Sequence, residues 1–213
     1  MKKKIAEILL DLNAVALRLE PPFTWASGRK SPVYCDNRLI ISDPQKRDAV
    51  ARSFVKMIEE SGWNPDVIAG TATAGIPHAA FVAQIMNLPM IYVRNRNKAH
   101  GKGNRIEGRL DKGQKVVLIE DLISTGNSSI EAGNGVKEAG GKLSAVAAIF
   151  TYGLPVAAQR FADADMQFKT LTDFTSLMQV AGSRGSLSDE QAAIIEEWQK
   201  NPAAWSKERG GEG

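Results

Sequence analysis

The chain has 213 residues, of which 43% are hydrophobic and 24% are charged, as in ordinary globular proteins. A chain of this kind can bury a sizeable core in one domain, which excludes intrinsic disorder and collagen-like structure. The formal net charge is +3, but residues 94–109 hold six Lys or Arg against one Glu, so this segment carries +5 and the remainder −2. The positive charge thus belongs to one segment, which does not favour a general basic face, and we expect no nucleic-acid partner.

Cysteine content and hydropathy indicate the cellular compartment of the protein. The single cysteine, Cys35, excludes a disulfide within the chain and is typical of a reducing compartment, so we expect a cytoplasmic protein. The basic start Met1–Lys4 is followed by acidic and polar residues instead of an apolar signal core. No run approaches the roughly 18 apolar residues of a membrane span, so we expect no membrane association.

The N-terminal part is predicted to contain two helices separated by an irregular segment. Apolar residues at helical spacing predict a helix over 5–19, which Pro21-Pro22 ends. Residues 23–42 lack a clean period and are predicted to form loop and short strand. A second helix is predicted from Pro44 to Gly62, with Ser42 or Asp43 as its cap.

Strands and helices alternate along the rest of the chain. Short apolar runs predict strands over 66–70, 89–93, 115–119, 145–150 and 168–171. Helices are predicted over 76–86, 127–139 and 155–162, with a last helix from the capping box at 188–191 to Asn201-Pro202. This alternation favours an α/β fold with a mostly parallel sheet flanked by helices. The Gly-rich tail 208–213 is predicted to be loose.

The segment after the strand at 115–119 carries the chemistry. The apolar strand runs into Glu120 and Asp121, then into a Ser/Thr/Gly turn at 124–126 and a helix start at Asn127. Ligands of open α/β sheets bind beyond the carboxyl ends of the strands. The turn offers N–H groups and hydroxyls to a phosphate, and the carboxylates can accept hydrogen bonds from ribose hydroxyls. The whole pattern favours a phosphorylated sugar over a plain acid pair beside a helix cap.

Two nucleotide-binding motifs fail on their residues. The stretch Gly70–Gly75 has the outer spacing of a Walker A loop, but Ile76-Pro77 follows where Lys and Ser or Thr are needed. The stretch Gly101–Gly103 opens like a dinucleotide fingerprint, but Ile106 occupies the place of the third glycine. Neither a Walker-type nor a Rossmann-type site is therefore predicted.

The motif at 116–129 resembles the signature for 5-phosphoribosyl-1-diphosphate (PRPP) of the type I phosphoribosyltransferases. The segments 23–34, 70–77 and 92–108 are similar to those of the orotate-specific members of that family. The resemblance covers roughly residues 20–160. It implies that family's fold, with a small hood formed by about residues 1–42 and the C-terminal part, and a mobile basic loop.

The resemblance assigns a role to each part of the motif. Glu120 and Asp121 are expected to hold the ribose 2- and 3-hydroxyls, the turn 124–128 to wrap the 5-phosphate, and the loop 71–75 to lie under the diphosphate. The implied PRPP-binding residues are Thr71, Ala72, Thr73, Ala74, Gly75, Arg94, Lys98, His100, Glu120, Asp121, Leu122, Ile123, Ser124, Thr125, Gly126, Asn127 and Ser128. The implied orotate-binding residues are Ser27, Lys30, Tyr34 and Ser124.

Arg94, Lys98 and His100 match the catalytic residues of the family's mobile loop. That loop reaches into the neighbouring subunit's site, which implies a homodimer. Cations delivered there would stabilise the departing diphosphate, and a closed loop would exclude water. The resemblance also implies Mg²⁺, held mainly through PRPP oxygens without direct protein ligands.

Several residues depart from the family pattern or lie outside the predicted chemistry. Many members of the family have lysine at the positions of Ala26, Ala74 and Asn95, so fewer cations would contact PRPP here. Arg96 is a candidate to replace the lysine missing at Asn95. His78 is interpreted as structural. Cys35 is interpreted as a small buried residue, because no partner His lies near it in sequence.

The implied reaction transfers phosphoribose from PRPP to orotate, giving orotidine 5′-phosphate and diphosphate for pyrimidine (UMP) biosynthesis. We expect no covalent intermediate, since no activated nucleophile pair is visible. Two alternatives stay open: a phosphoribosyltransferase for another base, which segment 23–34 should discriminate, and a non-catalytic PRPP-sensing regulator that binds nucleic acid. The −2 charge outside the basic segment weighs against the regulator.

Overall fold

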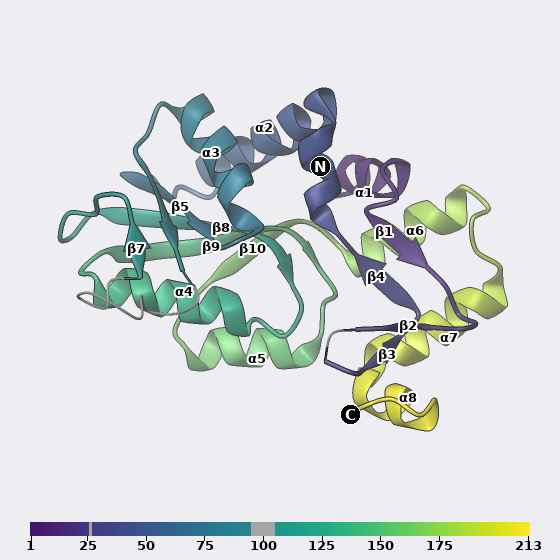
Figure 1. Ribbon diagram of the computed structural model, residues 1–213. Helices are drawn as coiled ribbons and strands as arrows, with labels where there is room; N and C mark the ends of the chain where they lie inside the picture. The colour runs from purple at the N-terminus through teal and green to yellow at the C-terminus, as the bar shows by residue number, and fades with distance from the viewer. Residues whose placement is uncertain (26, 95–104) are drawn as a thin grey trace.

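The computed structural model describes residues 1–25, 27–94 and 105–213 (Figure 1). Its described residues form a six-stranded sheet in the order β10-β9-β8-β5-β6-β7. The strands are β5 (Val67–Thr71), β6 (Met90–Val93), β7 (Ile106–Glu107), β8 (Lys115–Ile123), β9 (Lys142–Thr151) and β10 (Phe168–Asp173). Neighbouring strands are parallel except for β6 and β7. The predicted α/β class with a mostly parallel sheet is confirmed.

Helices cover both faces of this sheet. Figure 1 shows α2 (Pro44–Glu60) and α3 (Gly75–Met86) above it, and α4 (Asn127–Glu138) and α5 (Pro155–Asp163) below it. Successive residues of β8 point to opposite faces: Val117 and Ile119 join the apolar cluster of α2 and α3, whereas Val116 and Leu118 join that of α4 and α5. A strand buried on both faces reads as a continuous apolar run, which is why β8 is the clearest strand of the sequence.

The N-terminal segment and the C-terminal helices gather beside the sheet (Figure 1). Here β1 (Val15–Leu17) pairs antiparallel with β4 (Val33–Cys35), and β2 (Phe23–Thr24) with β3 (Lys30–Ser31). A 3₁₀ helix, η1 (Asn37–Ser42), leads into α2. Nearby lie α1 (Lys2–Asp11), α6 (Phe174–Ser183), α7 (Asp189–Lys200) and α8 (Pro202–Glu208). The division into a core and a hood stays a prediction.

The prediction of one helix over 5–19 is wrong beyond Asp11. Asn13 adopts a left-handed conformation with φ of 51°, which ends the helix. Val15–Leu17 then pair with β4 as strand β1, and Val15 packs into the core. Long-range strand pairing has therefore overridden the local helical spacing.

The chain beyond β10 is more ordered than its composition predicts. The capping box at Ser188 is confirmed, with the Ser188 hydroxyl accepting from the Gln191 N–H at 3.2 Å. The sequence did not predict α6 or α8. The tail predicted to be loose turns back onto the β2–β3 hairpin, where the Glu212 N–H donates to the Gly28 carbonyl at 3.1 Å. Among the described residues no helix is both long and apolar enough to cross a bilayer.

Burial of His78 on α3 makes folding stability depend on pH. The side chain is 2% exposed, and burial lowers its pKa to about 4. In the unfolded chain the His78 imidazole binds a proton near pH 6.5, whereas in the native state it stays neutral down to about pH 4. The free energy of unfolding therefore falls as the pH drops from about 6.5 to 4. Between pH 7 and 5, His78→Gln should lose about 2 kcal/mol less unfolding free energy than the parent.

Urea denaturation of both proteins at the two pH values measures this difference. Acidic groups such as the buried Glu120 titrate in both proteins, so their contribution cancels. Equal pH dependence in the two proteins would contradict the neutral, structural histidine.

Candidate active site

The candidate site lies where the carboxyl ends of the parallel strands β5, β6 and β8 meet. The backbone N–H of Ala72, just after β5, donates to the carbonyl of Val93, the last residue of β6, at 2.9 Å. Ligands of open α/β sheets bind at this edge. The fold therefore brings together the predicted segments around residues 71–75, 94 and 120–128, which are far apart in sequence.

An acidic pair ends the buried part of β8. Glu120 is 5% exposed; its carboxylate accepts from the Asp121 N–H at 3.1 Å and from the Ser129 hydroxyl at 3.0 Å. Burial raises the pKa of Glu120 well above its usual range, and the neighbouring charge of Asp121 raises it further. Burial also raises the pKa of Asp121. Two carboxyls held this closely favour a ligand that brings hydroxyl donors or a cation.

The turn after the acidic pair prepares an anion site. Gly126 has φ of 83°, and a Cβ there would lie 3.0 Å from the Phe161 ring, so the turn requires glycine. Arg160 donates to the Thr125 carbonyl at 3.3 Å. In the described part of the chain no side chain caps α4, which leaves the N–H groups of its first turn for a ligand.

The β5–α3 loop completes a polar cavity of about 290 Å³. Its lining residues are Thr71, Ala72, Thr73, Ala74, Glu120, Asp121, Leu122, Ser124, Thr125, Gly126, Ser128 and Ser129. All but Ser129 were predicted to bind PRPP. Of the other predicted residues in these segments, Gly75 and Ile123 are buried and Asn127 is exposed. Loop, acids and turn thus surround one space.

Gly75 lets α3 approach β8 at this cavity. A Cβ on Gly75 would collide with the Ile119 carbonyl oxygen and lie 3.4 Å from the Glu120 Cα. Because backbone atoms of a buried strand cannot give way, we expect Gly75→Ala to displace the loop and to weaken PRPP binding at least about tenfold. Isothermal titration with PRPP measures the effect.

Gly182→Ala is the matched control for this substitution. A Cβ at Gly182 on α6 meets nothing within 4 Å, so binding should not change and the helix should gain stability. PRPP binding by Gly75→Ala at parental affinity would contradict the assigned close contact.

A second cavity, of about 260 Å³, adjoins the first. It is lined by Trp25, Tyr34, Cys35, Leu122, Ser124 and Tyr152. Its lining is largely aromatic and apolar, which suits a flat ring, and it shares Leu122 and Ser124 with the polar cavity. The two cavities thus present a ring site beside a phosphate and diol site.

Comparison with known proteins identifies the family. The model of the phosphoribosyl transferase domain matches residues 40–171. An orotate phosphoribosyltransferase of Listeria innocua is 50% identical over 207 residues, which cover 97% of this chain and 99% of that one. One of Bacillus subtilis is 50% identical over 209 residues, 97% of each chain. The chain belongs to the orotate phosphoribosyltransferases.

Two solved structures have the same fold as this chain. The UMP synthase of Leishmania donovani matches with a TM-score of 0.79 and 27% identity over 92% of this chain and 42% of that one. The orotate phosphoribosyltransferase of Aeropyrum pernix matches with a TM-score of 0.74 and 24% identity over 86% of this chain and 99% of that one.

The structure separates the predicted orotate contacts of this orotate phosphoribosyltransferase. Tyr34 and Ser124 line the aromatic cavity. Ser27 and Lys30 do not line it: Ser27 is exposed, and the Lys30 ammonium donates to the Thr24 hydroxyl at 2.8 Å. Their role in binding orotate stays a prediction.

Sequence reasoning missed Trp25, Cys35 and Tyr152 as lining residues. Trp25 lies in segment 23–34, which resembles the orotate-specific members, and Cys35 follows it directly. Tyr152 comes directly after β9, whose carboxyl end lies at the sheet edge that holds the site. The strand-end rule that found Glu120 could therefore have found Tyr152. Cys35 is half-buried, and burial raises the pKa of its thiol well above the usual range, which fits its interpretation as a non-nucleophile.

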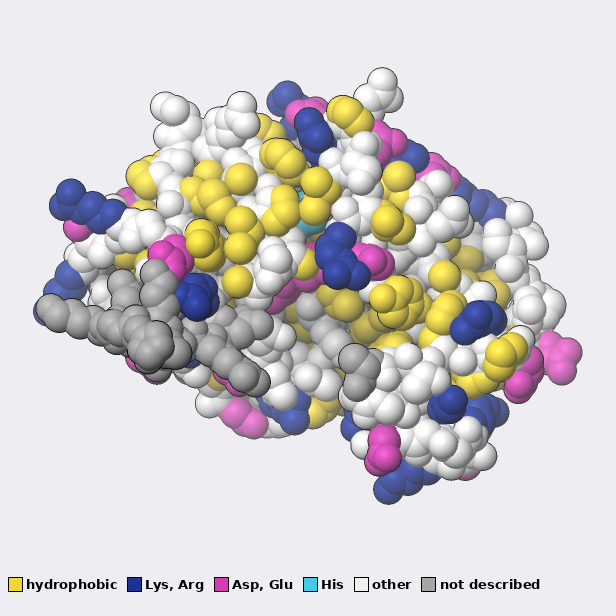
Figure 2. All heavy atoms as spheres, viewed as in Figure 1, with side chains coloured by type: hydrophobic (Ala, Val, Ile, Leu, Met, Phe, Trp, Pro, Cys, Tyr) yellow, Lys and Arg dark blue, Asp and Glu magenta, His cyan; other side chains and the backbone are white. Residues whose placement is uncertain are grey.

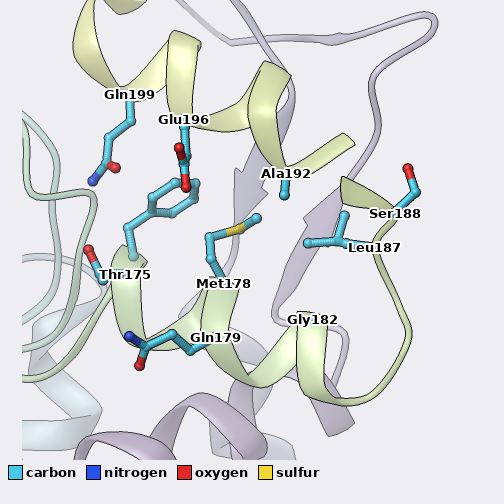
Figure 3. Close-up of a pocket in the computed structure, with 10 residues that line it drawn as sticks. Thr175, Met178, Gln179, Gly182, Leu187, Ser188, Ala192, Glu196 and Gln199 are labelled. Carbon is cyan, nitrogen blue, oxygen red and sulfur yellow. The ribbon is translucent and has the colours of Figure 1, made fainter. Parts of the chain in front are cut away.

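The wall behind Tyr152 is supported from the C-terminal helices. Gln199 on α7 donates to the Tyr152 carbonyl at 2.9 Å, and the Phe174 ring lies 6.3 Å from the Tyr152 ring. A cavity of about 420 Å³ lies between α6 and α7. Figure 3 shows Glu196 and Met178 projecting into it. Its lining includes Phe174 and Gln199, both of which contact Tyr152.

Of the predicted loop residues, the structure describes Arg94 alone. Its guanidinium lies 3.3 Å from the Glu107 carboxylate and is about one-third exposed. Its backbone is fixed on both sides, because its N–H donates to the Arg105 carbonyl and its carbonyl accepts from the Arg105 side chain. Lys98 and His100 lie outside the described residues. Arg94 thus follows β6, next to the loop 71–75.

Proposed function

We propose that this chain transfers the 5-phosphoribosyl group of PRPP to orotate, giving orotidine 5′-phosphate and diphosphate in pyrimidine (UMP) biosynthesis. The single observation that carries the proposal is the pair of adjoining cavities, one polar and acidic and one aromatic, which share Leu122 and Ser124. Relatives at 50% identity over nearly the whole chain carry the same activity in their names.

The polar cavity takes PRPP in this proposal. Glu120 and Asp121 accept hydrogen bonds from the ribose hydroxyls, the turn 124–128 and the α4 N-terminus hold the 5-phosphate, and the loop 71–75 carries the diphosphate. Orotate lies flat in the aromatic cavity. An orotate nitrogen forms the bond to the anomeric carbon as the bond from that carbon to the diphosphate oxygen breaks, and the electron pair leaves with the diphosphate. The proton that the nitrogen carried passes to the released diphosphate.

Charge builds on the diphosphate as the ribose becomes cationic. Arg94, Lys98 and His100 are the groups that we assign to stabilise it. We further propose that Lys98 and His100 act in the neighbouring subunit of a homodimer. Figure 2 shows hydrophobic side chains gathered over α3. Ile85 of that helix is 36% exposed, and this surface can bury apolar area against a second copy.

Mg²⁺ is the cofactor of the proposed reaction. The described residues hold no cluster of three or more candidate metal ligands. In this proposal the hard cation keeps water and takes its other oxygens from PRPP, beside the hydroxyls that Glu120 and Asp121 hold. When bound, Mg²⁺ neutralises part of the diphosphate charge.

We also propose that the enzyme is cytoplasmic, because a single unpaired cysteine, Cys35, suits a reducing compartment.

The test is formation of orotidine 5′-phosphate from orotate and PRPP, with Mg²⁺ and with a chelator. We expect product with Mg²⁺ and little without it. Competition among orotate, uracil and hypoxanthine then separates an orotate-specific enzyme from a phosphoribosyltransferase for another base. Preferential use of uracil or hypoxanthine would show that orotate is not the substrate. Salt-sensitive nucleic-acid binding without product would be the signature of a PRPP-sensing regulator.

A further inference from the structure

Asn37 is a buried amide that is hydrogen-bonded to one lining residue of each of the two cavities. It opens η1 and is 1% exposed. Its side-chain N–H donates to the Asp121 carbonyl at 2.7 Å, and its amide oxygen accepts from the Cys35 thiol at 3.3 Å. A buried amide is tolerated when both of its ends are hydrogen-bonded, as they are here.

These two hydrogen bonds join the walls of different cavities. Cys35 lines the aromatic cavity, and Asp121 lines the polar cavity. Their strands belong to separate sheets, because β4 pairs with β1 whereas β8 lies in the six-stranded sheet. Strand pairing therefore does not set the spacing between the walls, and the Asn37 amide spans it directly.

The backbone around Asn37 is itself anchored. The Asp36 N–H donates to the Ala14 carbonyl at 2.7 Å. The Asp36 carboxylate accepts from the Arg38 N–H at 3.1 Å and from two guanidinium nitrogens at 2.6 and 2.7 Å. The residues on either side of Asn37 are thus tied to each other and to the strand segment near β1, so the amide is held from a fixed base.

We propose that Asn37 is a positioning residue that fixes the base-binding wall on β4 against the ribose-binding end of β8. This inference rests on the proposed function. The reaction joins an orotate nitrogen held at one wall to an anomeric carbon held at the other. Because a misplacement of about 1 Å costs roughly 10²-fold in rate, an amide that sets this spacing acts on turnover more than on the binding of either substrate.

The test compares Asn37→Ala and Asn37→Leu with the parent. For each protein, kcat, the two KM values, the Tm and the calorimetric Kd of PRPP are measured. We expect kcat to fall roughly 10- to 100-fold while both KM values and the PRPP Kd stay within about threefold. Asn37→Leu fills the space with an apolar group of similar size, so it serves if Asn37→Ala does not fold.

Val136→Ala is the control for lost stability. Val136 is fully buried on α4, at the end of the helix away from the site, and its truncation should lower the Tm without changing kcat. Unchanged kcat in a folded Asn37 variant, or a rise in KM with kcat intact, would overturn the positioning role. So would an equal loss of kcat in Val136→Ala. An inactive parent would instead refute the proposed function.

Discussion

Replacing Lys98 with alanine is expected to lower kcat by about 10²- to 10³-fold, the effect of removing one preorganised donor from a developing anion. Lys98 lies in the segment that carries +5 while the rest of the chain carries −2, so the cations are concentrated where the sequence predicts a diphosphate. Steady-state kinetics give kcat, and thermal denaturation should give an unchanged Tm.

Lys102→Ala is the matched control for this variant. It removes the same charge from the same segment, so a general field effect would lower kcat equally in both variants. A specific role of Lys98 predicts a much smaller loss in Lys102→Ala. Parental turnover in folded Lys98→Ala would remove Lys98 from the catalytic residues.

Mixing two inactive variants tests whether Lys98 acts across subunits. In a heterodimer of Lys98→Ala and Asp121→Ala, one of the two sites receives both native residues when the loop comes from the partner. Random exchange of subunits should then restore about a quarter of the parental activity. If the mixture stays as inactive as its parts, the loop acts within its own subunit or the subunits do not exchange. Exchange is checked by mass spectrometry of tagged chains.

Replacing Asp121 with alanine is expected to lower kcat/KM for PRPP by about 10²-fold, because charge-assisted hydrogen bonds to the ribose are lost. The Tm should not fall. Asp121 helps to raise the pKa of the buried Glu120, so its removal relieves repulsion between two carboxyls that native packing forces together. A site whose charges cost stability in the absence of ligand is typical of functional residues.

Asp111→Ala is the control for the loss of an acid. Asp111 is an exposed residue in the turn before β8 and pairs with Arg109 at 3.0 Å, so kcat/KM should stay close to the parental value. An Asp121→Ala enzyme with unchanged kcat/KM for PRPP would place the ribose elsewhere.

The sequence by itself determined the fold class and most of the polar cavity. Continuous apolar runs such as Val116–Ile119 identify strands buried on both faces, and the ends of parallel strands meet at one edge. The loop 71–75 and the stretch 120–128 each lie directly after such a strand. Their roles therefore depend on local order along the chain together with one general rule about parallel sheets.

Only the tertiary structure decided the rest of the aromatic cavity, beyond the predicted Tyr34 and Ser124, and the end of the first helix. Tyr152, Trp25 and Cys35 come together because β9 and the N-terminal hairpin segments pack side by side, and the Asn37 amide reaches Asp121 across 84 positions of sequence. Val15–Leu17 form a strand because β4 offers a partner. Such contacts form between segments that are distant in sequence. Their free energy depends on which segments pack together, and a local pattern of residues does not specify that.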